Sequence, residues 1–266
     1  MAYQLQLLVA ALRVYTRFPF IARPPGAMRD EPARAADPLR YLPIAGLLVA
    51  IFQSVVYMLA SIVLPHAVAL LLALGAGLIL TGACHEVGWA RFCATLGERP
   101  ATPDSSHDSS DPVTDGWALQ GVVGVMLLLM LRFESLAHLD SDWIAASLIC
   151  AATFSRACAV LGSPRASATD ALIAMLLGAA PLALLAIWTD DHLPGLLGLS
   201  LALISTALVR RLIRRSGAMP ARAGGDTGSG AVQQIAEAGF LLGLLIALEA
   251  GPDDTVSTDD EMEPEQ

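Results

Sequence analysis

The sequence predicts an all-α fold, a polytopic membrane helical bundle with about seven transmembrane helices. Of its 266 residues, 55% are hydrophobic and 15% are charged, and the mean hydropathy of +0.59 does not fit a soluble surface. Several apolar runs approach the roughly 20 residues that a helix needs to cross the bilayer core. The 16 basic residues are all arginine, and all but Arg132 and Arg156 fall on alternate connections between these runs. A lipid bilayer is therefore the expected partner, and nothing in the composition points to nucleic acid.

The predicted elements begin with an interfacial helix and continue with membrane spans. Residues 3–20 are expected to form an amphipathic helix lying on the membrane, because Arg13 and Arg17 interrupt its apolar stretch. The first two spans form a helical hairpin, since Pro65 and His66 make a tight turn between them. The seven predicted spans are residues 42–64, 67–84, 117–137, 143–160, 171–188, 194–209 and 231–249.

The distribution of arginine predicts the orientation in the membrane. Loops that carry arginine stay in the cytoplasm. Six arginines precede the first span, two lie in the loop 85–116 and five in the loop 210–230, whereas the turns at 65–66, 138–142 and 189–193 have none. The N-terminus is therefore predicted to be cytoplasmic and, with seven spans, the C-terminus periplasmic. Both long polar loops then lie on the cytoplasmic face.

The chain is expected to contain one integral membrane domain, residues 1–250, and a short tail, residues 251–266. Seven carboxylates lie in the last fourteen residues, and they account for most of the net charge of −9. The tail is therefore expected to be solvated and disordered. The four cysteines have no metal-binding spacing and are expected to be free thiols: Cys84, Cys93, Cys150 and Cys158.

The first polar loop carries the first candidates for chemistry. His85 and Glu86 follow a predicted span, and ionisable groups at membrane depth are costly and are functional candidates. The alternative is that they are simply the first polar residues beyond the helix. Four aspartates then recur at intervals of four, three and four: Asp104, Asp108, Asp111 and Asp115. On a helix they would share one face and could hold a divalent cation with substrate phosphates. Pro103 and Pro112 favour a solvated acidic linker instead.

The second polar loop places arginines before a glycine cluster. Arg210, Arg211, Arg214 and Arg215 precede the segment GGDTGSG at 224–230, which opens the last predicted span. Backbone amides at a helix N-terminus bind phosphate, and glycines allow the ligand to approach the backbone closely. For the arginines alone, an anchor on anionic lipid is the favoured alternative.

Several short segments, spread nearly from end to end, together resemble one known family. They are YTRFP at 15–19, LPIAG at 42–46, TGACHEVGWARFCAT at 81–95, the stretch from Gln120 through Gly124 to Arg132, FSR at 154–156 and GGDTGSGAVQQIAE at 224–237. In this order they resemble the cobalamin synthases, or adenosylcobinamide-GDP ribazoletransferases, which are polytopic enzymes of the cell inner membrane.

The resemblance implies a reaction, a cofactor and a set of site residues. The reaction joins adenosylcobinamide-GDP to α-ribazole or its 5'-phosphate, and GMP leaves; such chemistry uses Mg²⁺ held by carboxylates and a base for the attacking group. The implied catalytic residues are His85, Glu86 and Asp115. Because the aspartates of the family signature are absent, the carboxylates that could substitute as metal ligands are Glu86, Asp104, Asp108, Asp111 and Asp115. The implied substrate-binding residues are Arg17, Gly88, Ser155, Arg156, Gly224, Gly225, Thr227, Gly228 and Glu237. Other cobalamin-assembly enzymes are possible partners in the membrane.

Departures from the family pattern leave two further hypotheses open. Val87, Arg91 and Ala94 stand where the family signature has aspartates, and Ser229 stands where a later segment has one. A catalytically degenerate relative that binds corrinoid or scaffolds partner enzymes is one alternative. A small-molecule transporter is the other; it is disfavoured because no paired repeats are visible and because the charged residues within the runs are expected near helix ends: Arg132, Glu134, Arg156 and Glu237.

Overall fold

The computed structural model describes residues 2–17, 38–96, 113–163, 165–189, 192–216 and 227–250. Within these ranges it has helices and turns and no strand, so the all-α prediction is confirmed. The elements are α1 (Ala2–Tyr15), η1 (Pro38–Tyr41), α2 (Leu42–Ser61), α3 (His66–Thr81), α4 (Cys84–Leu96), α5 (Val113–Ala137), α6 (Ser141–Gly162), α7 (Ala168–Thr189), α8 (Leu193–Ser216) and α9 (Thr227–Glu249).

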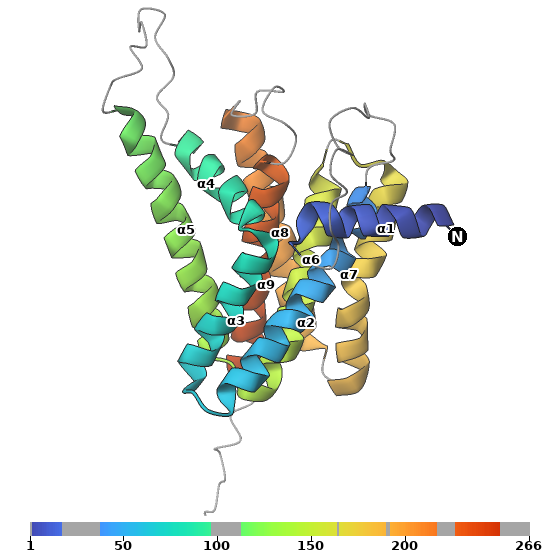
Figure 1. Cartoon of the computed structure of the whole chain (residues 1–266), viewed down its shortest axis with the longest axis vertical. Helices are drawn as coiled ribbons and strands as arrows, with labels where there is room; N and C mark the ends of the chain where they lie inside the picture. The colour runs from blue at the N-terminus through green and yellow to red at the C-terminus, as the bar shows by residue number, and fades with distance from the viewer. Residues whose placement is uncertain are drawn as a thin grey trace, which may run out of the picture.

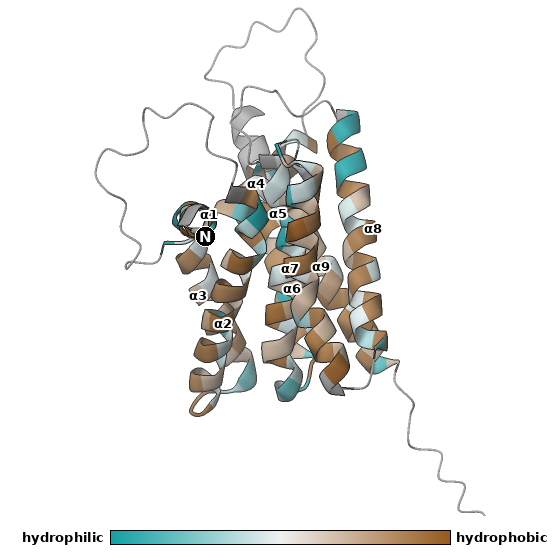
Figure 2. Cartoon of the chain, turned by 90° about the vertical axis from the view of Figure 1, so that its right-hand side faces the viewer, coloured by the Kyte–Doolittle hydropathy of each residue, from teal (hydrophilic) through white to brown (hydrophobic). Residues whose placement is uncertain are grey.

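The long helices run side by side as a bundle, and α1 crosses them near one end (Figure 1). Six described helices are long and apolar enough to cross a membrane, and the bent pair α3–α4 brings the number to seven if it is one span. This range confirms the predicted count. Figure 2 shows hydrophobic residues along the helices and hydrophilic ones at the upper end of α8. That end carries Arg214 and Arg215 in its last turn.

Helices α6 and α9 form the centre of the bundle. Their most apolar windows are 78% and 72% buried, whereas those of α5, α7 and α8 are 22–28% buried and present apolar side chains outward, as lipid-facing helices do. Small residues let α9 approach α8 closely: a Cβ on Gly243 would lie 2.5 Å from the carbonyl oxygen of Leu197. The tight α8–α9 packing therefore depends on the absence of a side chain at Gly243.

The prediction that a loop begins at residue 85 is wrong. The chain from Cys84 to Leu96 is helix α4, which is bent by 90° from α3. The bend has a local cause, because Gly82 and Ala83 have left-handed backbones, with φ of 65° and 54°. Their N–H groups donate to the carbonyls of Ile79 and Leu78 and so close the last turn of α3. The helix restarts in a new direction directly afterwards.

Other predicted boundaries also differ from the structure, and three of them move candidate residues or the interfacial helix. Helix α5 begins at Val113 rather than 117, so the backbone of Asp115 lies in its first turn. Helix α8 continues to Ser216, so Arg210 to Arg215 lie on a helix and not in a loop. Helix α1 ends at Tyr15, where residues 3–20 had been expected to be helical. The hydrophobic pattern shows where an apolar run ends. Backbone hydrogen bonds determine where the helix ends, which is before or after that point.

The bend at Gly82 gives a stability prediction. A Cβ there would lie 2.1 Å from Nε of Arg17, and the left-handed backbone alone costs a side-chain-bearing residue about 1–2 kcal/mol. We expect Gly82→Ala to lower the thermal unfolding temperature in detergent by at least a few degrees. Gly75→Ala is the matched control, because nothing lies within 4 Å of a Cβ at Gly75. Equal unfolding temperatures for the two variants would contradict this explanation of the bend.

Candidate active site

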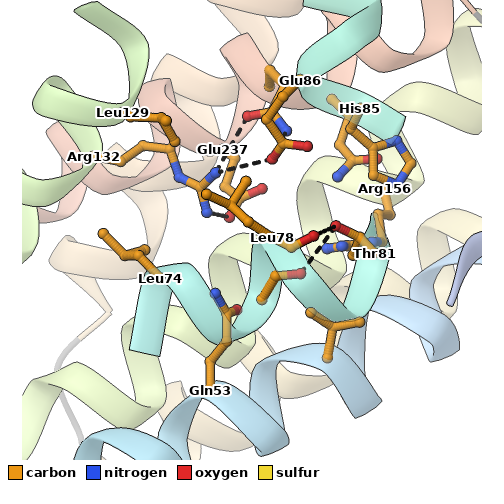
Figure 3. Close-up of a pocket in the computed structure, with 14 residues that line it drawn as sticks. Gln53, Leu74, Leu78, Thr81, His85, Glu86, Leu129, Arg132, Arg156 and Glu237 are labelled. Carbon is orange, nitrogen blue, oxygen red and sulfur yellow. Dashed lines mark hydrogen bonds and ion pairs between the residues drawn. The ribbon is translucent and has the colours of Figure 1, made fainter. Parts of the chain in front are cut away.

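Buried polar side chains gather beside the bend between α3 and α4 (Figure 3). They line a pocket formed by α2, α3, α4, α5, α6 and α9. The pocket opens on one side, and the free space enclosed by its walls is about 20 Å³, which is room for a water molecule or a single reacting group. The polar residues in its lining are Gln53, Thr81, His85, Glu86, Arg132, Arg156, Gln233, Gln234 and Glu237.

Four of these residues carry formal charges, and all four are buried. Glu86 is 7% exposed, Arg132 5%, Arg156 4% and Glu237 4%. Two arginines balance two glutamates, so the charged side chains of the pocket sum to zero. Buried charges are tolerated when they are paired and hydrogen-bonded, and a low-dielectric site holds such pairs in fixed positions.

Arg132 lies at the centre of the charge network. Its Nη2 forms an ion pair and hydrogen bond with Oε1 of Glu237, and its Nη1 donates to Oε1 of Gln234 at 3.3 Å. The same Nη1 lies 3.9 Å from Oε1 of Glu86. The amide of Gln234 completes the network, because its Nε2 donates to Oε1 of Glu86 at 2.8 Å. Helices α4, α5 and α9 are thus joined by one set of polar contacts.

Several polar atoms in this pocket have no hydrogen-bond partner among the described residues. They are Nε2 of His85, Oε2 of Glu86, Nε of Arg132 and Oε1 of Gln233. Buried polar atoms in folded proteins nearly always have a partner. Two acceptors and two nitrogens without partners, all on residues that line one pocket, therefore favour a polar ligand or a water molecule there.

The N-terminal segment reaches the same place from outside. The rings of Tyr15 and His85 are stacked, with centroids 6.1 Å apart and an interplanar angle of 13°. The backbone N–H of Arg17 donates to the carbonyl of Leu80 at 2.7 Å, and its exposed guanidinium lies against Gly82. Residues 15–17 therefore lie against the bend and support His85.

The structure brings four of the predicted site residues into the pocket: His85, Glu86, Arg156 and Glu237. It does not bring Gly88 or Ser155 there. Gly88 is buried against α9, where a Cβ on Gly230 would lie 3.3 Å from its Cα. Ser155 is fully buried and donates to the carbonyl of Ala152 on its own helix. In the structure these two residues pack helices together.

The remaining predictions fall largely outside the described residues. Asp104, Asp108, Asp111, Gly224 and Gly225 lie in ranges that the structure does not describe. For Asp115 and Thr227 it describes the backbone alone, at the starts of α5 and α9. Gly228 is buried in the first turn of α9. The phosphate-binding role predicted for the glycine segment stays a prediction.

Two expectations about charged residues need correction. Glu237 lies in the middle of α9, not near its end. Arg132, which the sequence analysis left out of the site, joins Glu86 and Glu237 and lines the pocket. An arginine inside an apolar run is costly in a membrane unless it has partners. That cost was the signal for Arg132, and Gln233 and Gln234 stand in the family-like segment at 224–237. Nothing in the sequence singles out Gln53.

The described residues do not fit a magnesium ion. No group of three or more His, Cys, Asp or Glu side chains lies close enough together in the described part of the chain. Of the five predicted ligands, only Glu86 has a described side chain, and its Oε1 is held by Gln234 beside the Arg132 cation. A cation next to Glu86 repels a divalent metal ion.

The comparisons with known proteins agree with one another. The family model described as cobalamin-5-phosphate synthase matches residues 7–245. Adenosylcobinamide-GDP ribazoletransferase of Azorhizobium caulinodans is 30% identical over 261 residues, which cover 89% of this chain and 94% of the relative. The proteins of that name from Ralstonia pickettii and Shewanella baltica are 29% and 28% identical, covering 90% and 88% of this chain and 95% and 91% of the relatives. No solved structure matches.

The Arg132–Glu237 pair predicts a pattern of stabilities. Glu237→Gln leaves the Arg132 cation without its closest partner and should lower the free energy of unfolding by about 3 kcal/mol or more. Arg132→Met should cost a similar amount, because Glu237 is then uncompensated. The double variant keeps the charges of the pocket balanced, so we expect it to be clearly more stable than the sum of the single losses predicts. Additive losses in denaturant unfolding would mean that the two side chains do not interact.

Proposed function

The chain belongs to the cobalamin-5-phosphate synthase family, and on that basis we propose that it joins adenosylcobinamide-GDP to α-ribazole or its 5'-phosphate and releases GMP. The family model matches almost the whole chain, and the relatives that align over nearly nine tenths of it are named for this transfer. The protein is therefore an enzyme of cobalamin biosynthesis, embedded in a membrane by several apolar helices.

The observation that carries the catalytic proposal is the unpartnered oxygen of Glu86. In this transfer an oxygen of the ribazole forms a new bond to phosphorus, the bond between that phosphorus and the GMP oxygen breaks, and the attacking hydroxyl loses its proton. Oε2 of Glu86 is buried, belongs to a residue that lines the pocket and has no hydrogen-bond partner among the described residues. It is placed to accept that proton, with Nε2 of His85 as the neighbouring alternative.

The size of the pocket limits what can enter it. Its enclosed space of about 20 Å³ has room for a reacting group and not for a whole substrate. The corrinoid with its nucleotide is much larger, so we propose that its bulk stays outside and that only its phosphates approach the pocket. Arg156 lines the pocket and uses one of its five N–H donors on the carbonyl of Ala152, at 2.9 Å. The others would serve phosphate oxygens.

The membrane setting gives the substrates a side from which to enter. We propose that the protein lies in the inner membrane with its N-terminus in the cytoplasm and its C-terminus in the periplasm. Four features lie at the same end of the bundle (Figure 1): helix α1, the C-terminal end of α4, the N-terminal end of α5 and the arginine-bearing end of α8. Arginine favours the cytoplasmic side of a membrane, so the substrates would enter there.

Magnesium and partner enzymes remain part of the proposal. If the aspartates between Asp104 and Asp115 hold Mg²⁺, the ion would neutralise pyrophosphate charge during the transfer. Transfer that persists at full rate in excess EDTA would exclude this role. Other cobalamin-assembly enzymes are proposed as partners on the cytoplasmic side.

One observation favours a second candidate, a relative that binds corrinoid without turnover. Val87, Arg91 and Ala94, which replace the aspartates of the family signature, recur at intervals of four and three on α4, and such positions share one helix face. Val87 is 44% exposed and Arg91 is also exposed. That face offers a cation instead of carboxylates, which suits an anionic ligand and not a metal ion.

Activity of the purified protein separates the two candidates. We expect GMP release that requires both adenosylcobinamide-GDP and α-ribazole. Because a general base contributes about 10²–10⁴-fold, Glu86→Gln should lower kcat by at least about 100-fold. Glu134→Gln is the matched control, since that carboxylate on α5 is 62% exposed. Corrinoid binding without any GMP release from the unmodified protein would favour the binding-only relative.

Reporter tags test the proposed orientation. Tags after Arg29 and within residues 98–110 should report a cytoplasmic location, and a tag after Gly251 a periplasmic one, because arginine-bearing connections stay inside. A cytoplasmic C-terminus would mean that the bent pair α3–α4 enters and leaves on the same side. The chain would then have six spans.

A further inference from the structure

We propose that Arg132 is a positioning residue for the transfer reaction, one that fixes Glu86 in the orientation in which its free oxygen meets the attacking hydroxyl. The inference rests on the proposed function. It assigns a role to a side chain for which neither the family pattern nor the predicted site had one.

The contacts of Arg132 are asymmetric. Its closest partner is Glu237, bound through Nη2, whereas Nη1 lies 3.9 Å from Oε1 of Glu86. Glu237 therefore anchors the guanidinium. The fork of Arg132 is planar, and its two contacts, Nη2 with Glu237 and Nη1 with Gln234, together fix its orientation. Nη1 lies between the Gln234 amide oxygen and the Glu86 carboxylate.

Arg132 restrains Glu86 through the side chain of Gln234. Its Oε1 accepts a hydrogen bond from Nε2 of Gln234 at 2.8 Å, and Arg132 binds the other end of that amide at 3.3 Å. The amide is thus held from both sides, and it can only present its nitrogen to Glu86. With Oε1 occupied, the carboxylate cannot rotate freely, and Oε2 remains for the ligand. Fixing a reacting group by neighbours that do not react is the usual way to keep it in productive geometry.

A buried arginine at position 132 costs free energy, because it lies within a membrane-spanning helix. Arg132 is 5% exposed and follows the run LLLML on a lipid-facing helix. Apolar side chains of similar volume usually stabilise a buried site at least as well as an ion pair does. A charge at this depth therefore points to a function beyond packing.

Arg132 also lines the pocket, and its Nε has no partner among the described residues. It could therefore act on a substrate directly instead of through Glu86. The two routes differ in how the effects of substitutions combine. A residue that acts only through Glu86 has nothing left to contribute once the Glu86 carboxylate is gone.

The test is a double-mutant cycle on the full-length protein in detergent or nanodiscs, with kcat and both KM values measured. We expect Arg132→Met to lower kcat by about 30-fold or more while KM for α-ribazole and for adenosylcobinamide-GDP changes by less than about threefold. The variant Arg132→Met/Glu86→Gln should have the kcat of Glu86→Gln alone, within about twofold.

Arg132→Lys is a second variant that keeps the test valid if Arg132→Met does not fold. It keeps the positive charge and loses the planar guanidinium group. It should fold with near-normal stability and still lower kcat, by about tenfold, since one ammonium cannot bind Glu237 and Gln234 in the same geometry. Its combination with Glu86→Gln should again be no worse than Glu86→Gln.

Three results would overturn the inference. Multiplicative losses in kcat would show that Arg132 acts independently of Glu86. A large rise in KM for adenosylcobinamide-GDP with unchanged kcat would make Arg132 a substrate-binding residue. Full activity of Arg132→Lys would reduce its role to charge balance. A lack of GMP release from the unmodified protein is a different failure, because it contradicts the proposed function itself.

Discussion

The ion pair between Arg132 and Glu237 is the interaction on which the arrangement of the site depends. It joins α5 to α9 inside the bundle, where water cannot compensate either charge. Through Gln234 it also reaches Glu86 on α4, so one guanidinium sets the relative positions of three helices. The pocket is therefore polar, electrically balanced and rigid, with a few atoms left for a ligand.

The bend at Gly82 and Ala83 makes this network possible. Without it, α3 would continue straight, and His85 and Glu86 would project from its end. The bend turns α4 across the bundle, so that both residues are buried against α5, α6 and α9. Tyr15 and Arg17 then hold the bend from the other side. A backbone feature of two residues thus converts the end of a span into the wall of a pocket.

Much of this could be predicted from the sequence, because composition and periodicity report on solvent. The uncharged run from residue 42 to 64 predicts a membrane span without further information, and an order of short motifs indicates the family. The bend could not be predicted, since a glycine in an apolar run is as compatible with close helix packing as with a left-handed backbone. Arg132 was absent from the predicted site for a related reason, because its partners on α9, Gln234 and Glu237, are 102 and 105 residues away along the chain. Long-range pairing is a property of the fold.

A structure of the protein with α-ribazole bound, at a resolution that shows side chains, tests the central claim most directly. We expect Arg132 to remain between Glu86 and Glu237 and a ribose hydroxyl to lie within hydrogen-bond distance of Oε2 of Glu86. A nucleoside bound away from the pocket, or a ligand that separates Arg132 from Glu237, would contradict the claim that this ion pair positions the reacting group.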